Sequence, residues 1–252
     1  LYDFCRTIDN IADDKNELNI KKKNLLIFKN DFINKNFDNL IIKNMWILME
    51  ENKISIKIVE DLFDGIESDL NEVVKFNKKK ELLIYSYRVA GTVGLMMAKI
   101  LGVQNKNSMK SAIDLGIAMQ LTNISRDVIE DMNNNRFYIN HDFETIKNTL
   151  SMADLFYESS FASIKEIPFR FRFAILVARR IYRKIGAKIL QKENIYNYNR
   201  SGKIYVANLG KLYQTFLSIL DLIKLIFINE KNHLRNKEHL LINEEIDLNE
   251  RI

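Results

Sequence analysis

The near absence of helix-breaking residues constrains the fold of this chain more than any other feature. Only one proline, Pro168, and eight glycines occur in 252 residues. Proline removes a backbone donor and clashes inside a helix, and glycine costs about 1 kcal/mol relative to alanine there. Polar and apolar side chains nowhere alternate over the length of a strand. We therefore expect a mostly helical, all-α chain.

Apolar side chains recur every three or four residues along most of the sequence, as amphipathic helices require. They predict one helical domain over residues 1–252, ending in a poorly patterned polar tail at 232–252. Gly102 is a natural helix end, Ser108 a candidate helix cap, and the asparagines at 133–135 a break. The expected helices cover residues 1–14, 24–50 (two pieces around Trp46), 54–76, 81–101, 108–131, 142–166, 169–192 and 203–231.

Composition and charge exclude several classes of protein. Hydrophobic residues make up 47% of the chain and charged residues 28%, which is typical of a globular protein. The single cysteine, Cys5, cannot form an internal disulfide, so we expect a reducing, cytoplasmic location. The net charge of +5 suits an anionic partner. We expect no nucleic acid, because the basic residues are scattered and form no known reader motif.

A long apolar stretch near the C-terminus bears on membranes. It reads FLSILDLIKLIFI at 216–228 and is interrupted by Asp221 and Lys224. A membrane-spanning helix needs about 20 predominantly apolar residues, and this stretch is too short and too charged. We expect a buried or interfacial helix, and peripheral association with a membrane.

Two pairs of acidic residues have the spacing of one helix face. The first is Asp9 and Asp13, with Arg6 three residues before Asp9. The second is Asp127 and Asp131. Side chains four residues apart lie on the same side of a helix, so each pair presents two carboxylates together. A pair of this kind taken alone is usually solvated surface charge.

The neighbours of the second pair favour a binding site. Asn123 lies four residues before Asp127, so Asn123, Asp127 and Asp131 form one stripe of oxygen-bearing side chains. Gln120 and Arg126 lie next to this stripe. Arg126 and Glu130, also four apart, could instead form an ordinary ion pair. Because both pairs recur beside an arginine and apolar residues, we expect them to face each other and bind Mg²⁺, a role that Mn²⁺ can also take. The arginines would hold phosphate oxygens.

The apolar stretch YSYRVAGTVGLMMAKILG at 85–102 lies between these pairs in the sequence. Gly91 and Gly94 would allow another backbone or a ligand to approach closely. Tight helix packing and a smooth wall for a long hydrocarbon both explain them, with Tyr85 and Tyr87 offering hydroxyls. They do not fit a dinucleotide-binding loop, because the GxGxxG spacing is missing.

Five stretches, in this order and spacing, resemble the squalene/phytoene synthases, which join prenyl diphosphates head to head. The likeness is strongest to the bacterial and plant phytoene synthases of that family. The stretches are FCRTIDNIADD at 4–14, DGIESDL at 64–70, YSYRVAGTVGLMMAKILG at 85–102, LGIAMQLTNISRDVIEDMNNNRFYI at 115–139 and IPFRFRFAILVARRIYRKI at 167–185.

The resemblance implies an isoprenoid synthase fold with helices around a central cavity, and a role for each matching residue. The implied metal ligands are Asp9, Asp13, Asp127 and Asp131. The implied catalytic residues are Tyr85, Arg6 and Arg126. The implied substrate-binding residues are Tyr2, Gln120, Asn123, Tyr138, Arg200 and Lys203.

The activity that the resemblance implies is the condensation of two geranylgeranyl diphosphates to phytoene in carotenoid biosynthesis. The reaction passes through a cyclopropyl diphosphate and releases diphosphate, and no nicotinamide cofactor is expected. A squalene or dehydrosqualene synthase acting on farnesyl diphosphate is an alternative, and a non-catalytic assembly factor is another. Sequence does not give the oligomeric state.

The sequence departs from the family pattern in three places. Asn10 stands where many relatives have aspartate, and Ser86 replaces a common cysteine. The family's first helix, with a Ser-Phe motif and diphosphate contacts, should precede Leu1. We therefore expect this chain to be a piece of a longer protein.

Overall fold

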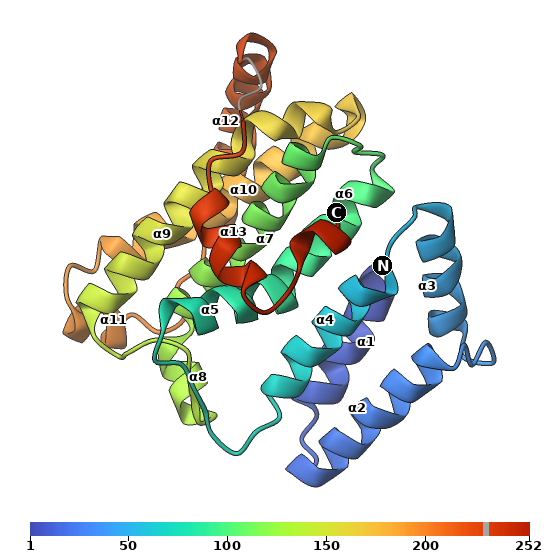
Figure 1. Cartoon of the computed structure of the whole chain (residues 1–252). Coiled ribbons are helices and arrows are strands. Elements are labelled where there is room, and N and C mark those ends of the chain that lie inside the picture. Colours follow the sequence, from blue (N-terminus) through green and yellow to red (C-terminus); the bar gives the residue numbers. More distant parts are fainter. Residues whose placement is uncertain (229–231) are drawn as a thin grey trace.

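The computed structural model describes residues 1–228 and 232–252, and these are mostly helical (Figure 1). The first part contains α1 (Tyr2–Asp13), α2 (Leu18–Ile33), α3 (Leu40–Glu51) and α4 (Ile56–Ser68). The middle contains α5 (Lys79–Ser86), the π-helical turn η1 (Tyr87–Gly91), α6 (Thr92–Ile100), α7 (Lys106–Arg126) and α8 (Val128–Asn133). The last part contains α9 (Phe143–Phe161), the 3-10 helix η2 (Ala162–Glu166), α10 (Phe169–Leu190), α11 (Ile195–Arg200), α12 (Asn208–Phe227), α13 (Asn236–Asn243) and the 3-10 helix η3 (Leu248–Glu250). The prediction of an all-α fold is confirmed.

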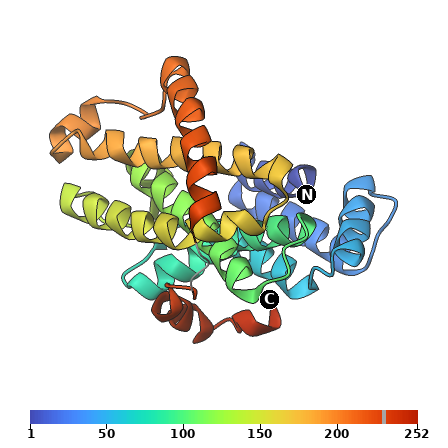
Figure 2. The ribbon, with the colours of Figure 1, turned by 90° about the horizontal axis from the view of Figure 1, so that it is seen from above.

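Helix α7 is the centre of the molecule. It packs against α5, η1, α6, α9 and α10. Figures 1 and 2 place α1 to α4 on one side of the body, and α9, α10 and α12 on the other. None of the described helices combines the length and apolar content that a membrane crossing would need.

An aromatic cluster orients the N-terminal helix. The Phe4 ring centroid lies 5.2 Å from that of Phe32 in α2 and 6.0 Å from that of Phe63 in α4. Phe4, Ile8 and Ala12 are all buried, one helical turn apart. Burying a side chain as large as phenylalanine or isoleucine contributes about 1.5–3 kcal/mol. This buried face determines the direction in which the aspartates of α1 point.

Several helix boundaries differ from those expected. Asn105, and not Ser108, caps α7, because its side chain accepts hydrogen bonds from the backbone N–H groups of Asn107 and Ser108. The helix expected over 108–131 changes direction at Asp127, where α7 ends and α8 begins. Gly102 ends α6 with a φ of +80°, as predicted. Residues 24–50 contain two helical pieces, as expected, although α2 already begins at Leu18.

The C-terminal part also differs from the expectation. The helix expected over 203–231 is α12, which ends at Phe227, and residues 229–231 of that expectation lie outside the described residues. In the tail, α13 and η3 bury Ile242, Ile246 and Leu248 against the core. These three residues are apolar and widely spaced, which is too weak a pattern to predict a helix.

A short parallel pairing of two strands was also not expected. Strand β1 (Val74–Lys75) follows α4, and β2 (Arg136–Phe137) follows α8. Val74 pairs with Arg136 and Lys75 with Phe137. Two residues are too few to show alternation. The pairing matters because it brings the segment after the first group of helices beside the end of the aspartate-bearing helix α8.

Candidate active site

The second aspartate stripe spans the change of helix at Asp127. The Asp127 backbone N–H donates to the Asn123 carbonyl at 2.9 Å, and the Asp131 N–H donates to the Asp127 carbonyl at 2.8 Å. These four-residue steps are the hydrogen bonding of an α-helix. Asn123, Asp127 and Asp131 therefore remain one hydrogen-bonded turn apart across the bend.

Basic side chains pair with this stripe. The Arg126 Nε donates to Asp127 Oδ1 at 2.8 Å, and its second nitrogen reaches the other carboxylate oxygen. Lys203 lies 3.5 Å from Asp127 and 2.7 Å from Glu130. Glu130 thus pairs with Lys203, not with Arg126 as the spacing had suggested. The stripe carries two cationic groups that could contact a phosphate.

The environment of the stripe opposes ionisation of Asp131. Burial, and then the charge of Asp127, raises the pKa of Asp131 to about 7, while Arg136 acts in the opposite direction. Like charges close together disfavour the ionised form unless a cation lies between them.

The first aspartate pair lies on α1. Burial, and then the charge of Asp13, raises the pKa of the half-buried Asp9, and Arg6 lowers it. Asp13 is exposed at the end of α1, and its charge acts on Asp69 and Arg136. The charge of Asp69 acts in turn on Asp131. The two predicted pairs therefore belong to one electrostatic environment.

Asp69 joins two of the predicted site tyrosines. The Tyr85 and Tyr138 hydroxyls donate to its two carboxylate oxygens, each at 2.6 Å, and lie 2.9 Å from one another. The two rings stack with centroids 4.7 Å apart. Burial raises the pKa of Asp69, while the two tyrosine hydroxyls and Arg136 lower it.

Asp69 and Arg136 were missed by the sequence reasoning. Asp69 lies in the stretch DGIESDL, but nothing there distinguishes it from Asp64 and Glu67, which pair with Lys29 at the surface. Only the packing of α4 against the rest of the molecule separates the two kinds of acid.

An apolar cavity of about 400 Å³ adjoins the stripe. It lies between η1, α6, α7, η2 and α10, and Gln120 and Asn123 are among its lining residues. The volume is within the range of ligand pockets, about 300–1,000 Å³. Asn123 Oδ1 is buried without a hydrogen-bond partner among the described residues. Because Asn123 belongs to both the stripe and the cavity lining, a polar group at the stripe can be continuous with an apolar chain in the cavity.

The two glycines of the stretch 85–102, Gly91 and Gly94, serve close packing. A Cβ added at Gly94 would lie 2.3 Å from the Ala112 carbonyl oxygen, and one at Gly91 would lie 3.0 Å from the Tyr87 ring. Gly94 also lines the cavity. The tight-packing explanation therefore holds for both glycines, and the cavity-wall explanation holds for Gly94 as well.

Three of the predicted residues do not join the cluster. Tyr2 is 77% exposed at the start of α1, and Arg6 is also exposed. Arg200 donates to the Tyr196 hydroxyl at 3.1 Å. Lys203, predicted with Arg200, does reach the stripe.

The available donors suit a hard, oxygen-preferring cation. The carboxylates of the two aspartate pairs and the unpaired amide oxygen of Asn123 are the ligand types that Mg²⁺ prefers, and phosphate oxygens of a substrate commonly complete its coordination. Arg126 and Lys203 add donors for phosphate oxygens. A diphosphate bound through divalent cations, with its hydrocarbon in the cavity, fits this arrangement.

Known proteins share this fold and part of this sequence. A solved dehydrosqualene synthase in complex with ligand superposes with a TM-score of 0.69 at 25% identity, over 88% of this chain and 85% of that one. A 15-cis-phytoene synthase from a Paracoccus species is 37% identical over 147 residues, which are 51% of this chain and 48% of the relative. The 15-cis-phytoene synthase of Enterobacter agglomerans is 34% identical, over 52% of this chain and 51% of the relative.

The arrangement of the helices thus defines an all-α protein with the isoprenoid synthase fold. The family model described as squalene/phytoene synthase matches residues 1–143, which is more than half of the chain. The chain belongs to the squalene/phytoene synthase family. It spans about half the length of the curated relatives it matches.

Proposed function

We propose that the protein containing this chain joins two molecules of geranylgeranyl diphosphate head to head. The product is phytoene, formed through a cyclopropyl diphosphate with release of diphosphate, as a step of carotenoid biosynthesis. The observation that carries this proposal is the position of Asn123, whose unpaired amide oxygen connects the aspartate stripe to the apolar cavity. The phytoene synthases among its relatives support this choice of product.

The residues of the chain would divide the work between the two ends of the substrate. Arg126 and Lys203 would bind diphosphate oxygens and stabilise the charge that develops as the diphosphate leaves. Mg²⁺, held by the two aspartate pairs, would neutralise the same oxygens and favour ionisation of the allylic carbon. The cavity between α6, α7 and α10 would hold the hydrocarbon and exclude water from the cation.

Tyr85 and Tyr138 would act beside the reacting carbons. Their hydroxyls are held by the same carboxylate, that of Asp69, so both are oriented before substrate binds. Such preorganisation lowers the cost of stabilising charge in the transition state.

The alternative substrate is farnesyl diphosphate, which would give squalene or dehydrosqualene. The likeness to a dehydrosqualene synthase over most of the chain favours it. The two substrates differ by one isoprene unit, so the depth of the cavity would decide between them. Intact aspartate pairs on both walls argue against a non-catalytic assembly role.

We also propose a cytoplasmic protein in peripheral contact with a membrane, through α12. One face of this helix is exposed and apolar; its members are Leu209, Leu212, Tyr213, Phe216, Ile219, Leu220, Ile223, Ile226 and Phe227. Their spacing of three and four residues is that of an interfacial amphipathic helix, which would insert this face among lipid chains. The net charge of +5 would strengthen binding to anionic lipids.

The enzymatic proposal is tested with the full-length protein and radiolabelled substrates. We expect phytoene from geranylgeranyl diphosphate in the presence of Mg²⁺. Product from farnesyl diphosphate alone would refute phytoene synthesis, and no product from either substrate would favour the assembly role. We expect Asp131→Asn to lower kcat/KM on the order of 10²–10³-fold, as removal of one charge-stabilising group typically does. Asp31→Asn on α2 is the control, because Asp31 is partly exposed and is not among the residues that line the cavity.

The membrane proposal is tested by flotation with anionic liposomes at low and high salt. We expect wild type to float at low salt and less so at high salt. Phe216→Asp should lower flotation severalfold, while Leu155→Asp, at another exposed apolar position on α9, should not. Equal flotation of the two variants would exclude α12 as the contact.

A further inference from the structure

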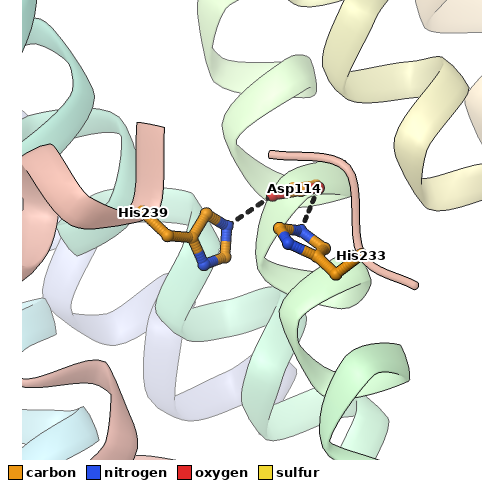
Figure 3. A group of neighbouring side chains, drawn as sticks. All are labelled: Asp114, His233 and His239. Atoms are coloured by element: carbon orange, nitrogen blue, oxygen red, sulfur yellow. Dashed lines mark hydrogen bonds and ion pairs between the residues drawn. The ribbon is translucent and has the colours of Figure 1, made fainter. Parts of the chain in front are cut away.

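A buried cluster of one aspartate and two histidines lies away from the aspartate stripe (Figure 3). Asp114 is in the middle of α7 and is 0% exposed. His233 precedes α13 and His239 lies within it, and both rings are also buried. Asp114 is 13 residues before Asp127 in the sequence, which is about 20 Å along the helices. The cluster is therefore separate from the candidate active site.

The three side chains converge on one point. His239 Nε2 lies 2.6 Å from Asp114 Oδ1, and His233 Nε2 lies 2.7 Å from Asp114 Oδ2. The Ser159 hydroxyl of α9 donates to the same Oδ2. Ligand atoms from the aspartate and both histidines lie within 4.8 Å of one another. A fully buried carboxylate needs compensating positive charge nearby.

The hydrogen bonds of His233 determine which of its two ring nitrogens carries the proton. The Asn236 amide nitrogen donates to the His233 carbonyl at 3.2 Å, which turns the amide oxygen toward His233 Nδ1 at 3.1 Å. Nδ1 therefore carries the proton and donates it to Asn236. In a neutral ring Nε2 then has no proton, although it lies 2.7 Å from a carboxylate oxygen, so a cation between the two atoms would stabilise the contact. Metal-binding histidines have this arrangement, with the second nitrogen donating to an oxygen.

His239 presents the second imidazole nitrogen. Its Nε2 faces Asp114 Oδ1, and its Nδ1 is buried without a hydrogen-bond partner among the described residues. In its neutral form the ring would bind a metal through Nε2, with the proton on Nδ1.

We propose that Asp114, His233 and His239 form a structural Zn²⁺ site that fastens the C-terminal helix α13 to the central helix α7. Two imidazole nitrogens and one carboxylate suit zinc, whereas Mg²⁺ prefers oxygen ligands alone. Zinc–ligand distances of about 2.0–2.2 Å in tetrahedral geometry require the nitrogen–oxygen separations to widen to roughly 3.3–3.6 Å. Small rotations of the histidine side chains achieve this. Ser159 would keep the carboxylate oriented.

The zinc site would affect the candidate active site through helix α5. Helix α13 packs against α5, which carries Tyr85. Zinc would hold the tail on α5 by joining residues more than 100 positions apart in the sequence. Loss of the metal should loosen α13 first and lower the thermal stability of the whole protein.

The test uses protein purified without a histidine tag, treated with a chelator and then dialysed. Zn²⁺ is added in the presence of excess Mg²⁺, which occupies the aspartate stripe. Elemental analysis should find about one Zn²⁺ per chain, and calorimetry should find saturable binding. Zinc should raise the melting temperature by several degrees, since a ligand that binds the folded state stabilises it. Co²⁺ in place of zinc should give the visible absorption of a nitrogen- and oxygen-ligated site.

Matched variants locate the metal. His233→Gln and His239→Gln should each weaken Zn²⁺ binding at least about 100-fold, since each removes a ligand. His141→Gln should leave binding unchanged, because His141, the third histidine, contacts Asn199 near the surface. Zinc-free wild type whose melting temperature does not respond to Zn²⁺ would overturn the proposal and leave a hydrogen-bonded cluster. Because that result comes from wild type, it holds even if the variants fail to fold, and it does not depend on catalysis.

Discussion

Replacing Asp69 with alanine removes the acceptor that two buried tyrosine hydroxyls share. Tyr85 and Tyr138 each donate to it at 2.6 Å. A hydrogen bond to a charged group contributes about 1.5–3 kcal/mol. Tyr85 can still donate to the Tyr138 hydroxyl, 2.9 Å away, so one donor is left unpaired. Since burial also makes the carboxylate itself unfavourable, we expect a net loss of about 2 kcal/mol in the free energy of unfolding.

Urea unfolding, followed by circular dichroism, measures this loss. Asp64→Ala is the control, because the Asp64 side chain is 43% exposed and pairs with Lys29 at 3.0 Å near the surface, where ion pairs contribute about 0–1 kcal/mol. An Asp69→Ala variant as stable as Asp64→Ala would refute the reasoning. We also expect lower turnover, because Tyr85 loses its orientation.

The pH dependence of Asp69→Asn provides a further check. Burial raises the pKa of Asp69 above its unfolded value, which is about 3.9. The folded state therefore binds the proton more tightly than the unfolded state does. Above the raised pKa, the buried carboxylate lowers the free energy of unfolding by its full amount. This destabilisation disappears as the pH falls toward the pKa of the unfolded state. Wild type should thus gain stability relative to Asp69→Asn as the pH is lowered from neutrality.

Two further predictions concern the scaffold. Gly116→Ala should lower the free energy of unfolding by about 1–3 kcal/mol, because the added Cβ would lie 2.3 Å from the Ala90 carbonyl oxygen. Gly186→Ala, whose Cβ would face only a leucine methyl at 3.2 Å, should be near neutral. Thermal unfolding of the two variants compares them. Asp142→Ala should cost about 0.5–2 kcal/mol, because Asp142 caps α9 through the Thr145 N–H at 2.7 Å. This hydrogen bond lowers the pKa of Asp142, so its stabilisation is present at neutral pH and is lost as the pH falls below about 3.9; urea unfolding at several pH values tests it.

Local sequence patterns predicted the helices well. They also predicted a helix end where a single residue determines it. Gly102 is left-handed as expected, because its φ of +80° is strained for other residues. The cap of α7 was placed wrongly at Ser108, because Asn105 and Ser108 are both good caps and the backbone uses the earlier one. The tail beyond 232 could not be predicted, because α13 is short and is stabilised by packing on α5.

The sequence by itself determined that the chain is helical and that two aspartate pairs each share a helix face, because both properties depend on neighbours three or four residues away. The tertiary structure alone decided which groups meet around them. Asp69 reaches Tyr138 across 69 positions, and Asp114 reaches His239 across 125. Contacts of that range depend on how helices pack, and no local spacing encodes them. Glu130 illustrates the difference: its spacing suggested Arg126 as its partner, but the fold brings Lys203 to it.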